Sequence, residues 1–268
     1  MGEQVEGKLL IIGGAEDKKG DCKILNKFVQ LAGGEEADIA VITTATEKPK
    51  EVGQEYQDIF LRLGAQRVDP IHINTRADAE SPYFEERLGQ ATGIFFTGGD
   101  QLRITSTLGG TPISGLLYEI YQKGVVIAGT SAGASVMSDT MIVGGKSNDT
   151  PKKSMLSMAP GLGFLKEVLI DQHFAQRGRI GRLLEAIAQN PFILGIGIDE
   201  DTAIIVNSDA HFEVLGSQTV TVADGRFVTH TNISELEPQE SLALLNVVLH
   251  VLPSGYRFDL HRREPVVY

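Results

Sequence analysis

Residues 125–135 read V-V-I-A-G-T-S-A-G-A-S, an apolar run that ends in a motif of small residues around Ser131. The apolar, β-branched run predicts a buried strand, and residues 129–133 fit the G-x-S-x-G pattern of a nucleophile elbow. An elbow turns sharply from a strand into a helix and holds its serine in a strained conformation that only small neighbours permit. Taken alone, the short motif fits a tight turn that happens to contain serine equally well.

Strands and helices alternate on the N-terminal side of this stretch. Predicted strands cover residues 8–12, 37–43, 68–73 and 93–96; predicted helices cover residues 51–63, residues 82–88 and a segment with Ile24, Leu25, Phe28, Val29 and Leu31 at helical spacing. The alternation predicts an α/β fold with a mostly parallel sheet and helices on both faces. Reactive groups in such sheets gather outside the carboxyl ends of the strands, where Ser131 falls.

The C-terminal half predicts additional antiparallel strands. Strands are expected at residues 166–170, 192–198, 203–206, 211–215, 219–223 and 226–230, with a helix carrying Ile180, Leu183, Leu184 and Ile187. We expect a turn at residues 207–210 to join the strands at 203–206 and 211–215. A turn at residues 224–225 would join those at 219–223 and 226–230. Residues 242–252 are apolar enough for either a strand or a helix, and residues 144–163 lack periodicity and predict a long loop.

Composition limits the class of protein. The 268 residues contain 42% hydrophobic and 22% charged residues with no visible linker, so we expect a single α/β domain over residues 1–268. The formal net charge of −11 argues against nucleic-acid binding. The single cysteine, Cys22, excludes an intrachain disulfide and suggests a reducing compartment. Neither a secretory signal nor an apolar run of about 20 residues is visible, so we expect a soluble, cytoplasmic protein without membrane contact.

Two glycine pairs follow predicted strands. Thr97-Gly98-Gly99-Asp100-Gln101 ends one of them, and its backbone N–H groups could donate to an oxyanion, although an ordinary glycine turn is an equally simple explanation. Gly13-Gly14 follows the first strand. The segment after it lacks the G-x-G-x-x-G spacing, and its lysines stand too late for a P-loop, which argues against a nucleotide site.

A serine nucleophile needs a base, and histidine is the usual one at neutral pH. Of the six histidines, His173 stands directly after a predicted strand, where a parallel sheet exposes functional groups. A carboxylate should orient the imidazole. Asp199, Glu200 and Asp201 all follow another strand, and their spacing does not choose among them. The acidic run also fits a solvated turn or a cation site.

Four motifs in this order resemble the cyanophycinase family of serine peptidases, which is related to dipeptidase E. They are residues 97–101 (TGGDQ), 129–134 (GTSAGA), 171–179 (DQHFAQRGR) and 197–202 (GIDEDT). The resemblance covers essentially the whole chain. It implies a flavodoxin-like core similar to that of class I glutamine amidotransferases, and homodimers that need no metal or organic cofactor.

The resemblance also implies an activity. Ser131 would be the nucleophile, His173 the general base and then acid, and Glu200 the orienting carboxylate. The substrate would be cyanophycin, a polyaspartate backbone with arginine joined to each β-carboxyl, which is released as β-aspartyl-arginine dipeptides through an acyl-enzyme. The chain order Ser, His, Glu differs from that of the α/β-hydrolases, so the same chemistry would stand on another connectivity.

A polymer that carries guanidinium and carboxylate groups needs both acids and arginines in its site. We expect Asp171 to pair with a guanidinium, and Arg177, Arg179 and Arg182 to grip carboxylates, unless these arginines form only a solvated helix face. The resemblance adds the hydrogen-bonding residues Gln101, Ser135 and Gln172. For the oxyanion hole we expect the backbone N–H groups of Gly99 and Ala132.

Two other functions fit the same residues. An aspartyl dipeptidase of the dipeptidase E type would use the same three side chains on short acidic peptides. A non-catalytic protein could instead bind the polymer, although an intact set of reactive residues speaks against it. A glutamine amidotransferase fits least, because those enzymes carry cysteine at the elbow, where this chain carries Ser131.

Overall fold

A nine-stranded sheet forms the centre of the computed structural model, which describes residues 5–145, 150–153 and 156–266. Five of its strands are parallel, in the order β1-β5-β4-β2-β3. They are β1 (Leu9–Ile12), β2 (Asp38–Ile42), β3 (Arg67–Ile71), β4 (Gly93–Phe96) and β5 (Val126–Thr130). The strands predicted for this half are confirmed, and only their boundaries shift.

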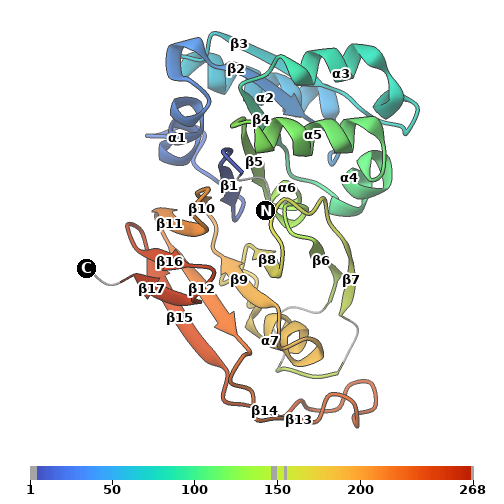
Figure 1. The fold of residues 1–268 in the computed structure, drawn as a ribbon, viewed down its shortest axis with the longest axis vertical. Helices are drawn as coiled ribbons and strands as arrows, with labels where there is room; N and C mark the ends of the chain where they lie inside the picture. Colours follow the sequence, from blue (N-terminus) through green and yellow to red (C-terminus); the bar gives the residue numbers. More distant parts are fainter. Residues whose placement is uncertain (1–4, 146–149, 154–155, 267–268) are drawn as a thin grey trace.

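Helices cover both faces of the parallel strands (Figure 1). They are α1 (Lys23–Leu31), α2 (Pro49–Arg62), α3 (Pro82–Gly89), α4 (Gln101–Leu108), α5 (Pro112–Gln122) and the short α6 (Ala132–Ser135), with 3-10 turns η1 (Gly34–Glu36) and η2 (Asp78–Glu80). Side chains alternate along β1, so Leu10 packs in one cluster with Phe28 of α1 and Phe60 of α2. Leu9 packs in the other cluster with Leu117 of α5.

Antiparallel strands extend this sheet from the far side of β1. They are β10 (Thr202–Val206), β11 (His211–Gly216), β16 (Arg257–Asp259) and β17 (Glu264–Val266). The predicted hairpin between residues 203–206 and 211–215 is therefore confirmed as β10 and β11. The expected α/β architecture with extra antiparallel strands in the C-terminal half is present.

A second, four-stranded sheet lies in the lower half of Figure 1, in the order β15-β12-β9-β8. Its strands are β8 (Val168–Gln172), β9 (Leu194–Ile198), β12 (Thr219–Asp224) and β15 (Val248–Pro253), and α7 (Ile180–Gln189) connects the parallel pair β8 and β9. Ile170, Ile196 and Val220 of this sheet share one hydrophobic cluster with Ile11 and Ile127 of the first sheet. The sequence patterns predicted most of these strands but not their separation into another sheet.

The strand predicted at residues 226–230 is wrong, because β12 pairs with β9 and β15 instead. The carboxylate of Asp224 accepts hydrogen bonds from both the backbone N–H and the Nε of Arg226, which folds the chain back on itself after the turn. Only β13 (His230–Thr231) follows, paired with β14 (Leu244–Leu245). The undecided residues 242–252 therefore contribute to strands β14 and β15.

The long loop predicted at residues 144–163 is partly wrong. Strand β6 (Thr140–Gly144) pairs with β7 (Ser157–Pro160), while residues 146–149 and 154–155 lie outside the described residues. Every residue of β7 is exposed or only partly buried. Strand β7 is therefore defined by its backbone pairing with β6. It lacks the alternation of apolar and polar residues by which a half-buried strand is predicted from sequence.

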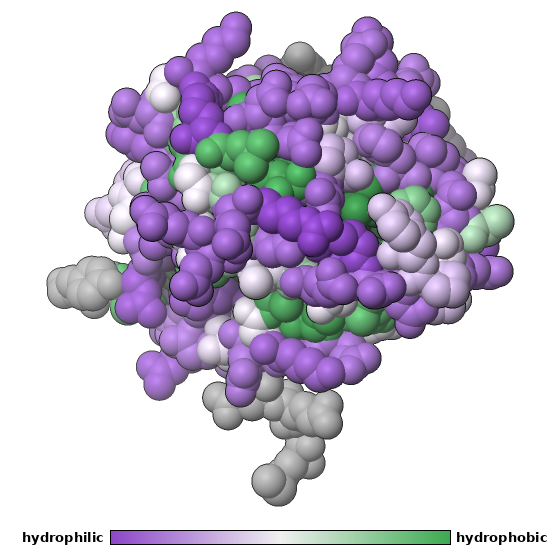
Figure 2. Space-filling model, turned by 90° about the horizontal axis from the view of Figure 1, so that it is seen from above, coloured by the Kyte–Doolittle hydropathy of each residue, from purple (hydrophilic) through white to green (hydrophobic). Residues whose placement is uncertain are grey.

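No helix in the described residues is both long and apolar enough to cross a bilayer. The face seen in Figure 2 is mostly hydrophilic, with small hydrophobic patches between polar side chains. Dispersed patches of this kind are ordinary on a protein surface.

The outer glycines of the G-x-S-x-G motif allow α6 to pack against β4 and β5. A Cβ at Gly133 would lie 2.4 Å from the carbonyl oxygen of Phe96, and one at Gly129 would lie 2.2 Å from the carbonyl oxygen of Gly133. Backbone atoms cannot move aside cheaply at such distances. The motif is therefore a packing requirement of the fold as well as a setting for Ser131.

We predict that Gly133→Ala lowers the free energy of unfolding by about 1–3 kcal/mol, because its methyl group overpacks the junction of β4 and α6. Urea unfolding followed by circular dichroism measures the change. The control is Gly115→Ala in α5, where a Cβ meets nothing within 4 Å. That substitution should be neutral or stabilising by up to about 1 kcal/mol, because alanine favours helix more than glycine does. Equal losses in the two variants would contradict the packing argument.

Candidate active site

Ser131 lies between β5 and α6 with φ 52° and ψ −110°, a conformation that is rare for a residue other than glycine. Its backbone N–H donates to the carbonyl oxygen of Ile12 at 3.1 Å, which fixes the turn against β1. The strained backbone expected of an elbow is thus observed at Ser131.

The structure brings Ser131, His173 and Glu200 into one hydrogen-bonded chain. Ser131 Oγ lies 2.9 Å from His173 Nε2, and His173 Nδ1 lies 2.7 Å from Glu200 Oε1. Because a carboxylate only accepts hydrogen bonds, Nδ1 carries the proton and Nε2 is left to accept from the serine hydroxyl. The three residues come from different places in the fold: after β5, after β8, and in the link from β9 to β10.

Burial keeps the imidazole of His173 neutral. It lowers the pKa of His173 below the usual 6.5, and the positive charge of Arg177 acts in the same direction. The hydrogen bond and the charge of Glu200 raise this pKa but do not cancel the effect of burial. At neutral pH the ring can therefore take a proton from Ser131.

The turn at Gly13 and Gly14 belongs to this site, which the sequence did not predict. The carbonyl oxygen of Gly13 accepts from the N–H of His173 at 2.8 Å, and that of Gly14 accepts from the N–H of Asp201 at 2.9 Å. Gly14 has φ 97°, and a Cβ there would lie 2.4 Å from His173 Cε1. The available signal was a glycine pair at the carboxyl end of the strand next to β5.

The acidic run after β9 divides into three separate roles. Glu200 contacts His173, while Asp199 accepts from the N–H of Ala175 at 3.0 Å and from Thr219 Oγ1 at 2.9 Å. Both flanking aspartates are engaged with backbone groups, so neither replaces Glu200 beside the ring. Within the described residues, no group of three or more His, Cys, Asp or Glu side chains is placed to hold a metal ion.

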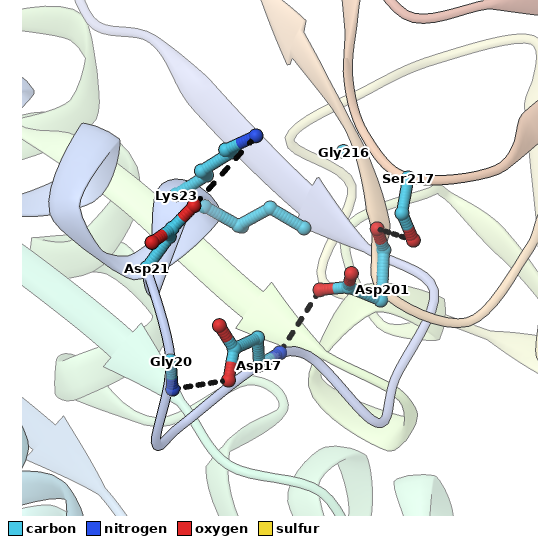
Figure 3. Close-up of a pocket in the computed structure, with 8 residues that line it drawn as sticks. Asp17, Gly20, Asp21, Lys23, Asp201, Gly216 and Ser217 are labelled. Atoms are coloured by element: carbon cyan, nitrogen blue, oxygen red, sulfur yellow. Dashed lines mark hydrogen bonds and ion pairs between the residues drawn. The ribbon is translucent and has the colours of Figure 1, made fainter.

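Asp201 fixes the loop that follows Gly14. Its Oδ1 accepts from the N–H of Asp17 at 2.9 Å, beside a cavity of about 360 Å³ (Figure 3). Hydrogen bonds from the N–H groups of Gly20, Cys22 and Lys19 lower the pKa of Asp17 to about 2. Asp17 therefore stays ionised and organises the loop, which is tied to the segment that carries Glu200.

The oxyanion hole expected at Gly99 and Ala132 stays a prediction. Gly98 is the glycine beside the nucleophile, since a Cβ there would lie 3.4 Å from Ser131 Cβ. Gly99 has φ 145°, and a Cβ there would lie 2.1 Å from the carbonyl oxygen of Ala45. Ala132 is the first residue of α6, so its N–H belongs to the turn that follows Ser131. The glycine pair thus lets the chain pass between Ser131 and Ala45.

Asp171 binds the chain's own arginines in this structure. Its Oδ2 accepts from Arg182 Nε at 2.7 Å, its Oδ1 accepts from Arg179 at 3.3 Å, and the Asp171 side chain is 1% exposed. Arg179 also donates to Gln172 Oε1 at 2.9 Å. Because both carboxylate oxygens of Asp171 already accept from these arginines, neither is open to a substrate guanidinium in this structure. The substrate-binding role of Asp171 stays a prediction.

Arg179 keeps an unused donor. Burial lowers the pKa of Arg179 to about 10, which leaves it charged at neutral pH. Its Nε is buried and has no hydrogen-bond partner among the described residues. A substrate carboxylate could satisfy that atom, so the predicted role of Arg179 retains a structural argument.

The other predicted binding residues differ in accessibility. Arg177 is exposed and its charge acts on His173, which places it near the base. Gln101 Nε2 donates to the carbonyl oxygen of Ile142 at 2.8 Å, and Ser135 is 2% exposed within α6. Gln101 thus connects α4 to β6. The roles of Gln101, Ser135, Gln172 and Arg177 in binding stay predictions.

Known proteins resemble this chain over most of its length. The model of peptidase family S51 matches residues 9–214. A cyanophycinase of Geminocystis herdmanii is 40% identical over 99% of this chain and 98% of its own, and one of Nostoc sp. is 43% identical over 95% and 86%. The crystal structure of a peptidase from an acI-B1 Actinobacterium aligns with TM-score 0.66 at 24% identity, covering 92% of this chain and 98% of that one.

We predict that the rate at which a sulfonyl fluoride modifies Ser131 falls only below pH 6.5, because the pKa of His173 is lowered and the ring must be neutral to act as base. The reaction rate should thus rise with pH through a midpoint below 6.5. Glu200→Gln removes interactions that raise this pKa, so the midpoint moves to lower pH and the rate falls about 10²–10⁴-fold. Arg177→Gln should move the midpoint to higher pH. Shifts in the same direction for the two variants would contradict this assignment.

We predict that Gly14→Ala lowers the rate of Ser131 modification about 10²-fold, because the new methyl group displaces the imidazole of His173. Gly64→Ala is a matched control: Gly64 has φ 96°, close to the 97° of Gly14, but a Cβ there meets nothing within 4 Å. Both variants should lose about 1–2 kcal/mol of stability from backbone strain, and only Gly14→Ala should lose reactivity. Full reactivity of Gly14→Ala would remove Gly14 from the site.

Proposed function

The chain belongs to peptidase family S51, and on this basis we propose that it is a serine exopeptidase that degrades cyanophycin to β-aspartyl-arginine dipeptides. The observation that carries the proposal is the chain of hydrogen bonds from Ser131 through His173 to Glu200 at the carboxyl ends of the strands. The full-length similarity to cyanophycinases supports the choice of substrate.

The reaction would proceed through an acyl-enzyme. Ser131 Oγ forms a bond to the carbonyl carbon of a backbone peptide bond while its proton passes to His173 Nε2. His173 then gives this proton to the departing amine as the C–N bond breaks. A water molecule attacks the ester carbonyl, His173 takes its proton, and the ester bond breaks to return the proton to Ser131 Oγ. Glu200 stabilises the imidazolium that forms in each half of the cycle.

The strained turn at Ser131 suits this cycle. The elbow holds Oγ at the His173 ring before any substrate binds, so no backbone rearrangement is needed for attack. The His173 ring is neutral at neutral pH and carries its proton on Nδ1, so Nε2 can accept the proton of Ser131. We further propose that backbone N–H groups at Ala132 and Gly99 stabilise the oxyanion, a contribution that is commonly worth about 2.7–4 kcal/mol per donor.

The alternative of an aspartyl dipeptidase uses the same three residues and differs only in substrate. The buried Arg179, with its unused Nε, suits a carboxylate in either substrate. The cyanophycinase relatives favour the polymer because their similarity spans nearly the whole chain. A homodimer and a cytoplasmic location remain predictions from the family resemblance and the composition.

We predict that the protein releases β-aspartyl-arginine from purified cyanophycin and that Ser131→Ala lowers this release about 10⁴-fold or more, because the nucleophile is lost. Chromatography with mass spectrometry identifies the product. Ser106→Ala, at an exposed serine of α4, is the matched control and should retain the activity of the parent protein. Faster cleavage of α-Asp-X dipeptides than of cyanophycin would favour the dipeptidase, and retained release by Ser131→Ala would refute the mechanism.

A further inference from the structure

A second cavity, of about 230 Å³, opens beside Ser131 and has no role in the steps described above. Thr130 and Ser131 line it, together with Glu16, Lys18, Glu55 and Tyr56. The last four of these residues come from the loop after β1 and from α2, and they form the wall that this part of the chain supplies to the cavity. A ligand in this cavity would lie against Ser131.

Glu16 is a buried carboxylate among the residues that line this cavity. It is 5% exposed; its Oε2 accepts from Thr130 Oγ1 at 2.6 Å, and its Oε1 accepts from the Tyr56 hydroxyl. Burial and the negative charge of Glu16 raise the pKa of Tyr56 well above its usual value, so Tyr56 stays the donor. Each carboxylate oxygen has two lone pairs, and one hydroxyl on each leaves capacity for two further donors.

Lys18 shows that a cation fits this wall. Its Nζ lies 4.3 Å from the centre of the Tyr56 ring and 3.1 Å from Glu55 Oε2. The side chains of Lys18 and Glu55 are 28% and 49% exposed, so water screens this ion pair and weakens it. The wall carries two carboxylates, Glu16 and Glu55, and one ammonium, that of Lys18, so its formal charge is negative, and an exposed ion pair holds Lys18 in place.

We propose that this cavity is a subsite for a cationic side chain of the substrate, an arginyl guanidinium, which takes the place of Lys18 over Tyr56 and between Glu16 and Glu55. A guanidinium stacks on an aromatic ring and donates in a plane to carboxylates, which suits this wall better than the point charge of an ammonium. As a specificity site for an arginine-bearing polymer, the subsite rests on the proposed function. Its affinity for a guanidinium does not depend on hydrolysis.

The test uses protection of Ser131 from a sulfonyl fluoride. The probe is acetyl-arginine amide, whose only charge is the guanidinium, and the control ligand is acetyl-citrulline amide, its neutral isostere. In the parent protein the arginine derivative should slow the modification of Ser131, and the citrulline derivative should not. Glu55→Gln should weaken this protection about tenfold, whereas Lys18→Met should strengthen it several-fold because the internal competitor is gone.

The direction of the Lys18→Met effect distinguishes a lysine that competes with the ligand from one that only supports the cavity. Loss of a supporting lysine would weaken protection instead of strengthening it. Glu16→Gln is a third variant, expected to weaken protection at least as much as Glu55→Gln. Equal protection by the two ligands, no protection in the parent protein, or unchanged protection in Glu55→Gln would overturn the subsite. Protection without any hydrolysis of cyanophycin would refute the proposed substrate and leave the subsite standing. Hydrolysis of cyanophycin without protection would refute the subsite and leave the proposed substrate standing.

Discussion

The candidate site depends on two backbone hydrogen bonds from one glycine turn. Gly13 accepts from the N–H of His173, which follows a strand of the second sheet, and Gly14 accepts from the N–H of Asp201, in the link between the sheets. Ser131 is bound to the same strand end through Ile12. The carboxyl end of β1 therefore fixes the nucleophile, the base and the segment of the carboxylate relative to one another.

Strained backbone accompanies each of these segments. Ser131, His173 and Asp201 all have φ near +50°, and so does Ala15 after the glycine turn. Each such conformation costs about 1–3 kcal/mol and persists only where the surrounding structure enforces it. Here the enforcement is the packing of small residues between strands, which explains why the glycines of the elbow and of the first turn tolerate no side chain. The protein thus gives up some stability to hold its reactive groups in place.

The sequence predicted the parallel strands, the elbow at Ser131 and the loop position of His173, because each produces a local signal: an apolar run, a motif of small residues or a strand end. It left Asp199, Glu200 and Asp201 unresolved from spacing alone, and the family resemblance selected Glu200. It missed Gly14 and Glu16, which are hydrogen-bonded to Asp201 and Thr130, each more than 100 residues away in the chain. It also misplaced a strand after Asp224, because hydrogen bonds from Arg226 to the carboxylate of Asp224 turn the chain there. Long-range contacts of this kind leave no periodic pattern in a sequence.

The place of Glu200 in the link between the two sheets has a consequence for synthesis. The ribosome makes the N-terminal half first, and domains fold in that direction as the chain emerges. A nascent chain carries Ser131 well before it carries His173 and Glu200, and the link closes only when β10 pairs with β1. The serine is thus without its base while the polypeptide is still being extended. The three side chains can therefore come together only late in synthesis, after the segment that carries Glu200 has been made.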